Sequence, residues 1–132
     1  MEPDTGSIRL LQFMICEKFE PLKNDGYRVE GVRSNLHVPS FPAVLSDYYL
    51  VTCWRKDERF HKEVIEYAVD GGPPLKTPPM DIEPVRDHVI FRWHKHRFPE
   101  NLRIEKPCTL WIRVALDWNV CLESYLLIEQ NV

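Results

Sequence analysis

The chain has 132 residues, 44% of them hydrophobic and 11% aromatic, which is enough to bury a core in a single domain spanning 1–132. Its 17 basic and 20 acidic residues give a net charge of −3, and this balance argues against a nucleic-acid partner. No apolar run approaches the roughly 20 residues that cross a bilayer, and no export signal opens the chain, so we expect a cytoplasmic protein without a membrane partner.

The first elements predicted from the sequence are two strands that form a hairpin. Residues 8–19 carry apolar side chains on both alternating faces, which is typical of a buried strand, and we expect residues 1–7 before it to be flexible. A Lys-Asn-Asp-Gly turn follows at 23–26, because glycine tolerates a positive φ. The second strand then runs over 27–38.

A third strand is predicted over 48–54, and the segment that follows it fits two patterns. Within 61–69, apolar residues at every second position from 65 onward fit a strand, but a helical spacing with Asp57 as its N-cap is also present. The strand is favoured because a tight Asp-Gly-Gly turn follows directly and the neighbouring elements are strands. Residues 73–84 contain too many prolines for regular structure, so we expect an extended surface loop.

The last three predicted strands cover 88–96, 108–118 and 120–130, and the final two form a hairpin. In the first of these strands, the apolar residues at alternating positions from Val89 to Trp93 point to one face. In the second, the alternation is stronger, and it predicts one buried face. The alternating apolar residues there are Cys108, Leu110, Ile112, Val114, Leu116 and Trp118.

These patterns amount to about seven short strands separated by turn signals. We therefore predict an all-β protein: a single-domain antiparallel β-sandwich, immunoglobulin-like or similar, with a small β-barrel as the alternative. Two stacked sheets would bury the apolar faces. The four cysteines form no Cys-x-x-Cys pair, and without an export signal we expect them to be reduced and buried.

The candidate metal ligands are His94 and His96, which lie two residues apart and so point to the same face of their predicted strand. A His-x-His pair with a third ligand from a neighbouring strand is how some β-barrel enzymes bind a metal. Arg92, Lys95 and Arg97 surround the pair with positive charge, which disfavours a cation. We therefore expect an exposed polar face here, with no bound metal and no cofactor.

Two further surfaces are candidates for binding a partner. The loop that carries Phe41 is stiffened by Pro39 and Pro42, although Phe41 can instead plug the end of the sandwich. Trp111 lies opposite the apolar row of its strand and near Arg113, where an aromatic residue either covers a second layer or marks an interface. The candidate binding residues are Phe41, Arg92, His94, Trp111 and Arg113.

The sequence offers no catalytic constellation, since it lacks a Gly-x-Ser-x-Gly elbow and a phosphate-binding glycine loop. It therefore favours a non-enzymatic binding or assembly module, with a second copy of itself or another protein as its partner. The first alternative is a metal-dependent β-barrel enzyme that uses His94 and His96. The second is a sandwich that binds a small polar ligand through Arg92, His94 and Arg113.

The first half of the chain carries three short motifs: Phe-Met-Ile-Cys-Glu at 13–17, Gly-Val at 31–32 after an Asp-Gly turn, and Pro-Ser-Phe-Pro-Ala at 39–43. Together they resemble a family of small bacterial proteins described only as a domain of unknown function. After the Gly-Val pair that family leads us to expect an aromatic residue and an acid, whereas this chain has Arg-Ser at 33–34. The resemblance implies a strand at 61–69 and brings no activity, cofactor or catalytic residue.

Overall fold

The computed structural model describes residues 7–24 and 26–131, and every regular element in these two ranges is a β-strand. The predicted all-β class is confirmed, with more strands than expected. Residues 1–6, most of the segment expected to be flexible, lie outside the described residues. In chain order the strands are β1 (Arg9–Cys16), β2 (Lys18–Pro21), β3 (Tyr27–Glu30), β4 (Asn35–Val38), β5 (Tyr49–Arg55), β6 (His61–Val69), β7 (Leu75–Lys76), β8 (Met80–Ile82), β9 (Phe91–Arg97), β10 (Cys108–Leu116) and β11 (Asn119–Gln130).

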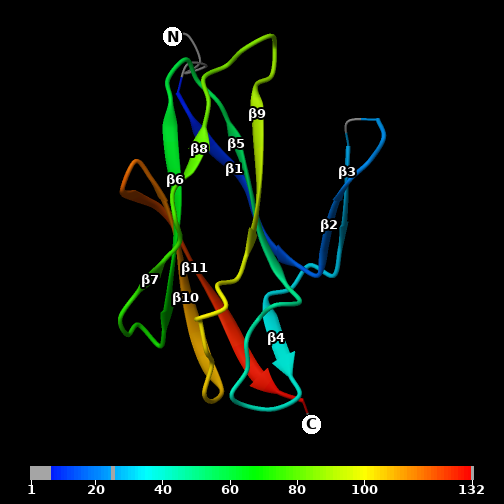
Figure 1. Ribbon diagram of the computed structural model, residues 1–132, viewed down its shortest axis with the longest axis vertical. Coiled ribbons are helices and arrows are strands. Elements are labelled where there is room, and N and C mark those ends of the chain that lie inside the picture. The colour runs from blue at the N-terminus through cyan, green and yellow to red at the C-terminus, as the bar shows by residue number, and fades with distance from the viewer. Residues whose placement is uncertain (1–6, 25, 132) are drawn as a thin grey trace.

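Two sheets packed face to face form the body of the molecule (Figure 1). The smaller sheet has three strands in the order β1-β5-β9, and the larger has six, in the order β4-β11-β10-β6-β7 with β8 also paired to β6. Within the described residues neither sheet closes on itself, so the arrangement is sandwich-like. The remaining two strands, β2 and β3, form a separate hairpin. Across the same residues, no helix has the length and apolar character needed to span a membrane.

The apolar row of β10 lies at the centre of the core. Its buried members are Cys108, Leu110, Ile112 and Val114. The strand ends at Leu116, two residues earlier than predicted, because Asp117 and Trp118 form the turn into β11 with φ of 49° and 67°. Positive φ at both positions is what a tight two-residue hairpin turn requires. Trp118 is therefore 65% exposed and is not a core residue.

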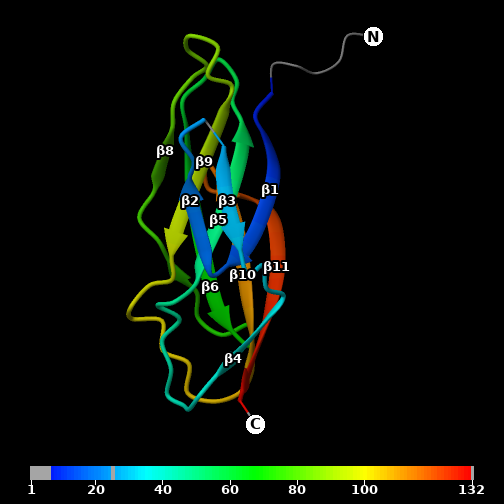
Figure 2. The same ribbon diagram turned by 90° about the vertical axis from the view of Figure 1, so that its right-hand side faces the viewer.

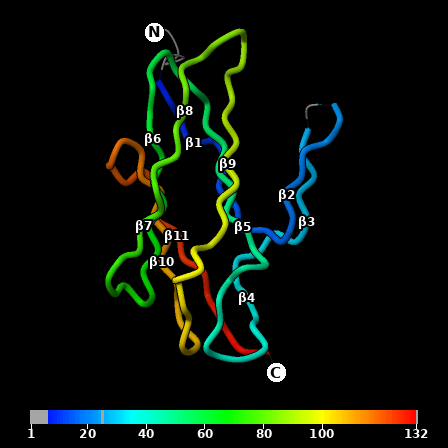
Figure 3. Tube along the Cα trace, viewed as in Figure 1, coloured from blue at the N-terminus to red at the C-terminus, as the bar shows by residue number. Residues whose placement is uncertain are grey.

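The single strand predicted over 27–38 is two strands. Gly31 interrupts it with a φ of 67°, and any side chain at this position would overlap the carboxylate of Glu17. Beyond this bend the chain leaves the hairpin and reaches the larger sheet, where β4 pairs with β11 in parallel (Figure 3). The larger sheet is therefore mixed, and the expectation of a wholly antiparallel sandwich is wrong at this one edge.

The segment 61–69 is strand β6, as predicted, and it pairs with β10 on one side and with β7 and β8 on the other. The proline-rich segment 73–84 is not a loop throughout, because β7 and β8 form within it. Both are short strands at the edge of the sheet, where a proline between them removes no necessary hydrogen bond.

The β2–β3 hairpin covers the outer face of the smaller sheet (Figure 2). Phe19 and Tyr27 of the hairpin stack with 4.7 Å between ring centroids, and their centroids lie 5.5 and 5.1 Å from that of Trp93 on β9. Cys16 and Val51 are buried in the same cluster. As a result, the outer face of β9 is covered at Trp93.

His61 connects separate parts of the chain through two carboxylates. Its Nε2 lies 2.8 Å from Asp57, and its Nδ1 lies 2.6 Å from Asp117 in the β10–β11 turn. Asp57 also accepts the backbone N–H of Ile8, and Asp117 accepts that of Lys62. Burial by itself lowers the pKa of His61, but the hydrogen bonds and charges of the two aspartates outweigh it and raise the pKa above its usual value. Only the imidazolium can donate to both carboxylates at once.

We expect this contact to make the stability of the fold depend on pH. Because the pKa of His61 is raised in the folded chain, its contribution is fully present below the unfolded pKa and is lost as pH rises through the folded pKa. The free energy of unfolding in urea should therefore be higher for the wild type than for His61→Gln at low pH, and this difference should shrink as the pH rises through the folded pKa. A difference that is constant with pH would contradict the assignment, and His37→Gln is the control at an exposed histidine.

Candidate metal centre

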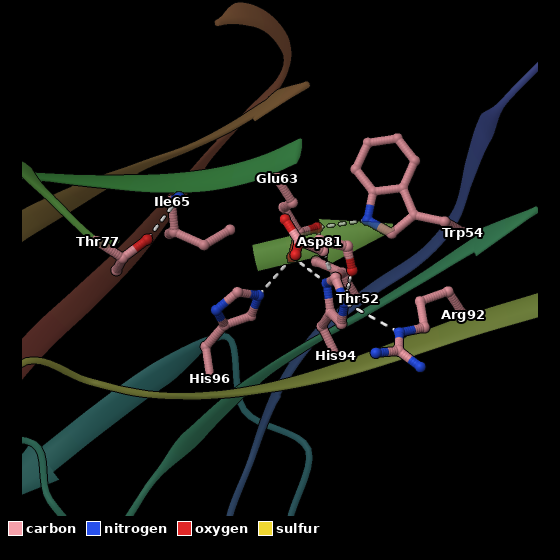
Figure 4. Close-up of polar contacts among 9 residues, drawn as sticks. All are labelled: Thr52, Trp54, Glu63, Ile65, Thr77, Asp81, Arg92, His94 and His96. Carbon is pink, nitrogen blue, oxygen red and sulfur yellow. Dashed lines mark hydrogen bonds and ion pairs between the residues drawn. The ribbon is translucent and has the colours of Figure 1, made fainter. Parts of the chain in front are cut away.

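A fully buried carboxylate, Glu63, lies at the centre of the candidate site (Figure 4). It belongs to β6 and shares the inner face of that strand with Ile65 and Tyr67, which are also fully buried. Side chains two residues apart on a strand point the same way. The alternation that buries these two large side chains therefore buries the carboxylate as well.

His94 and His96 approach Glu63 from β9 on the opposite sheet (Figure 4). They are 2% and 4% exposed, so the expectation of an exposed polar face is wrong. The physical reason lies on the other face of the strand, where Trp93 is covered by the aromatic rings of the β2–β3 hairpin. With that face turned to the hairpin, the histidine face is the one that points into the sandwich.

Glu63 divides its two oxygens between two pairs of donors. Oε1 lies 2.8 Å from Nδ1 of His94 and 2.5 Å from Nε2 of His96. Oε2 accepts hydrogen bonds from the Thr52 hydroxyl at 2.8 Å and from the indole N–H of Trp54. Both of these donors lie on β5, which pairs directly with β9, so strands of the two sheets meet at one carboxylate.

These contacts keep Glu63 ionised. Burial by itself raises the pKa of the carboxyl group, but the hydrogen bonds from His94 and His96, together with their charges, outweigh it and lower the pKa to about 2. Glu63 is therefore an anion at any physiological pH. A buried anion of this kind is tolerated only where its oxygens are hydrogen-bonded or bind a cation.

The second ring nitrogen of His94 has two partners of opposite character. Nε2 lies 3.3 Å from Nε of Arg92, which is a donor, and 3.2 Å from the carbonyl oxygen of Asp81, which is an acceptor. When Nδ1 carries the proton and donates to Glu63, Nε2 accepts from Arg92. When the proton is on Nε2, it is donated to the Asp81 carbonyl and leaves Nδ1 with a free lone pair. The second tautomer points this lone pair at the ionised Oε1 of Glu63, 2.8 Å away, so it requires a cation between the two atoms.

Glu63, His94 and His96 are suited to hold a divalent transition metal. One nitrogen of each imidazole and one carboxylate oxygen all lie within 4.8 Å of one another. Ligands about 2.1 Å from a tetrahedral zinc ion stand about 3.4 Å apart, so binding would lengthen the contacts of Glu63 Oε1 with the two imidazoles, now 2.8 and 2.5 Å, by about 0.6–0.9 Å. The hydrogen bonds to Oε2 would keep the carboxylate oriented, as outer partners of metal ligands commonly do.

The interior beside this cluster has an unpaired polar group and an accessible space. The Tyr67 hydroxyl is buried and has no hydrogen-bond partner among the described residues. Burial raises the pKa of Tyr67, and the charge of Glu63 adds to the effect. His96 lines a cavity of about 500 Å³ between β9 and the β7–β8 segment. The cluster is therefore buried but lies next to a space that a ligand can enter.

The other predicted binding residues do not join this site. Phe41 is half-buried and packs against the main core, and its role in binding a partner stays a prediction. Trp111 and Arg113 lie on the outer face of the larger sheet, with the guanidinium 5.7 Å from the ring centroid. Of the residues proposed for a small polar ligand, only Arg92 and His94 lie together, so that three-residue site is not formed.

The sequence reasoning missed Glu63, although the alternation of β6 contains the signal for it. Counting back two residues from Ile65 along the inner face reaches Glu63, which places a carboxylate at a core position. The same step from Leu50 on β5 reaches Thr52 and then Trp54. These residues could have been identified as buried polar groups, but their meeting depends on which strands face each other.

Comparison with known proteins found no matching family model and no matching curated protein. The resemblance to a bacterial domain of unknown function therefore stays a prediction. Among solved structures, the chain is similar to Pseudomonas fluorescens alkylpurine DNA glycosylase AlkC bound to DNA containing an abasic site analog, with a TM-score of 0.47 and 12% sequence identity. The match covers 94% of this chain and 31% of that one, so this chain spans less than a third of the length of the glycosylase.

This match contradicts two expectations from the sequence. It is to an enzyme bound to DNA, whereas the sequence favoured a non-enzymatic binding or assembly module that takes itself or another protein, and no nucleic acid, as its partner. Neither expectation is carried forward. At this level of similarity no activity is transferred from the glycosylase to this chain either, and function has to be inferred from the site.

We expect Thr52→Val to destabilise the fold, because it removes one donor from a buried anion without changing the shape of the side chain. A hydrogen bond to a charged group contributes about 1.5–3 kcal/mol, so the free energy of unfolding in urea should fall by about 2 kcal/mol. Thr109→Val is the matched control, since Thr109 is a half-buried strand residue whose side chain makes no hydrogen bond in the described structure. Equal effects of the two substitutions would contradict this account.

Proposed function

We propose that this protein binds a divalent transition-metal ion through Glu63, His94 and His96. The observation that carries the proposal is the convergence of one carboxylate oxygen and two imidazole nitrogens, from opposite sheets, within 4.8 Å. All three side chains are buried, in a position where an apolar residue would cost less. A cluster of buried ionisable groups beside a cavity is a common property of functional sites.

The types of donor favour zinc, iron or cobalt over magnesium or calcium. Two imidazoles with one carboxylate are the ligands of many catalytic zinc sites and of non-haem iron sites. Magnesium and calcium require about six or more ligands, almost all of them oxygens. Three protein ligands also leave at least one coordination position for water or a substrate.

The local charge supports a cation. Among the described residues, the ion-pair partners of Glu63 are the two histidines, so its charge is not cancelled by a lysine or an arginine. Of the positive residues that argued against a metal, Lys95 is directed to an aromatic ring and Arg92 does not contact Glu63. The ammonium of Lys95 lies 4.1 Å from the ring centroid of Tyr49, and Arg92 contacts the nitrogen of His94 that faces away from the carboxylate.

The hydrogen bonds around the cluster support one set of ligand atoms. His94 would bind through Nδ1 while its Nε2–H donates to the carbonyl of Asp81, 3.2 Å away. His96 would bind through Nε2, and Glu63 through Oε1 while Oε2 keeps its two donors from β5. His94 and Glu63 would then each have a partner that orients them, which strengthens a metal site.

A metal held in this way supplies Lewis-acid chemistry at its open position, and such chemistry is used by many hydrolytic enzymes. The sequence suggested a metal-dependent β-barrel enzyme that uses His94 and His96. In the present proposal Glu63 is the third ligand, and the site lies between two sheets and not in a barrel. We infer that the protein is a metal-dependent enzyme whose reaction takes place on the side of the cluster that faces the cavity.

Untagged protein should bind one equivalent of Zn²⁺ or Co²⁺ in isothermal titration. The Co²⁺ complex should show visible absorption bands, because imidazole and carboxylate ligands split the d levels of the ion. The melting temperature should rise with added metal, since a ligand that binds only the folded state at about 100 times its Kd adds about 2.7 kcal/mol. If the folded wild type binds neither ion at millimolar concentration, the proposal is wrong.

Substitution of a ligand should weaken binding without affecting an unrelated histidine. We expect His96→Gln to lower the Zn²⁺ affinity by more than about 100-fold, since loss of even an outer partner costs 10- to 100-fold. His37→Gln, which changes an exposed side chain of β4, should bind Zn²⁺ as the wild type does. Equal affinity in His96→Gln, with its fold verified by circular dichroism, would place the ion elsewhere.

A further inference from the structure

The cavity beside His96 has walls of two kinds. It lies between β9 and the segment that contains β7 and β8, and its volume is about 500 Å³, within the range of small-molecule sites. Leu75, Met80 and three prolines form an apolar part of the wall. Polar and cationic side chains form the rest, among them Lys76, Arg97 and Asn101.

The charge of this lining has a single sign. Among the described residues, no aspartate or glutamate lines the cavity, whereas Lys76 and Arg97 do. Neither of these two side chains forms an ion pair with another described residue. Lys95 also contributes to the wall, but its ammonium lies over the Tyr49 ring. Two cations without counter-charges at an apolar cavity create a field that attracts an anion.

His96 places this cavity directly beside the candidate metal centre. Its Nε2 lies 2.5 Å from Glu63, and the same imidazole lines the cavity. Thr77 lines the cavity as well, and its hydroxyl is held by the backbone N–H of Ile65 (Figure 4). A molecule in the cavity would therefore lie against one of the three proposed metal ligands.

We propose that this cavity binds a small organic anion with an apolar body, in which a carboxylate or phosphate group contacts Lys76 and Arg97 and the body packs against the prolines and Met80. That such an anion is the substrate rests on the proposed metal centre. That it binds in the cavity does not. The apolar wall selects against a bare inorganic ion, and the absence of a carboxylate among the described lining residues selects against a cation.

Benzoate and phenyl phosphate are the probes, and neutral benzamide is the matched control with the same ring. Both anions should shift the amide NMR signals of residues 75–80 and 95–101 in a saturable way. Benzamide should bind at least about tenfold more weakly, the equivalent of one ion pair of about 1.4 kcal/mol. Binding of either anion supports the inference and identifies the preferred head group. If benzamide binds as tightly as both anions, or if no signal in these ranges moves, the inference is overturned.

Matched variants test where the head group lies. Lys76→Gln and Arg97→Gln are exposed substitutions that should leave the fold intact, and each should weaken the tighter anion by about tenfold. Lys106→Gln removes an exposed lysine outside the cavity and should have no effect. Equal weakening by all three would indicate a general charge effect and would overturn the inference.

The same titrations, in metal-free and Zn²⁺-saturated protein, separate this inference from the proposed function. Anion binding at these residues in a chain that takes up no metal supports the cavity and overturns only the metal centre. Zn²⁺ binding without any anion response supports the metal centre and overturns only the cavity. When both hold, the anion should bind more tightly to the Zn²⁺ form, because the ion adds positive charge beside the cavity.

Discussion

One buried carboxylate joins the two sheets of this protein. Glu63 of β6 accepts hydrogen bonds from Thr52 and Trp54 of β5 and from His94 and His96 of β9. Removing a carboxylate from water costs several kcal/mol, and a nearly complete set of donors is needed to offset that cost. The network therefore also specifies register, because a shift of β6 by one residue would carry Glu63 to the outer face and break all of these bonds together.

The hydrogen-bond network around Glu63 includes residues of an edge strand and lies beside the cavity. β9 is the edge strand of the smaller sheet, and β7 and β8 lie at the edge of the larger one. The apolar row of β10 lies in the main hydrophobic core, and Trp54 of the central strand β5 belongs both to that core and to the polar cluster. The edge between the sheets carries ionisable groups and a cavity that a small molecule can reach.

The alternation of residues predicted the strands well, and its errors have local causes. It located β6 and β10 and their inner faces, because a strand with one buried face repeats every two residues. It ran past Gly31 and Trp118, where a positive φ ends the strand. It also assigned the wrong inner face to β9. Alternation shows that one face of a strand is apolar, but it does not show whether a hairpin or the opposite sheet packs on that face.

The sequence by itself determined the all-β class, the approximate position of most strands and the residues that share a face. These properties depend on the local period of two and on the positions of glycine and proline. Only the tertiary structure decided that the β2–β3 hairpin covers Trp93 and that β9 faces β6. His94 and His96 lie 31 and 33 residues from Glu63, and they meet it because two sheets pack against each other. No local preference of the chain specifies which strands will lie opposite one another in that packing.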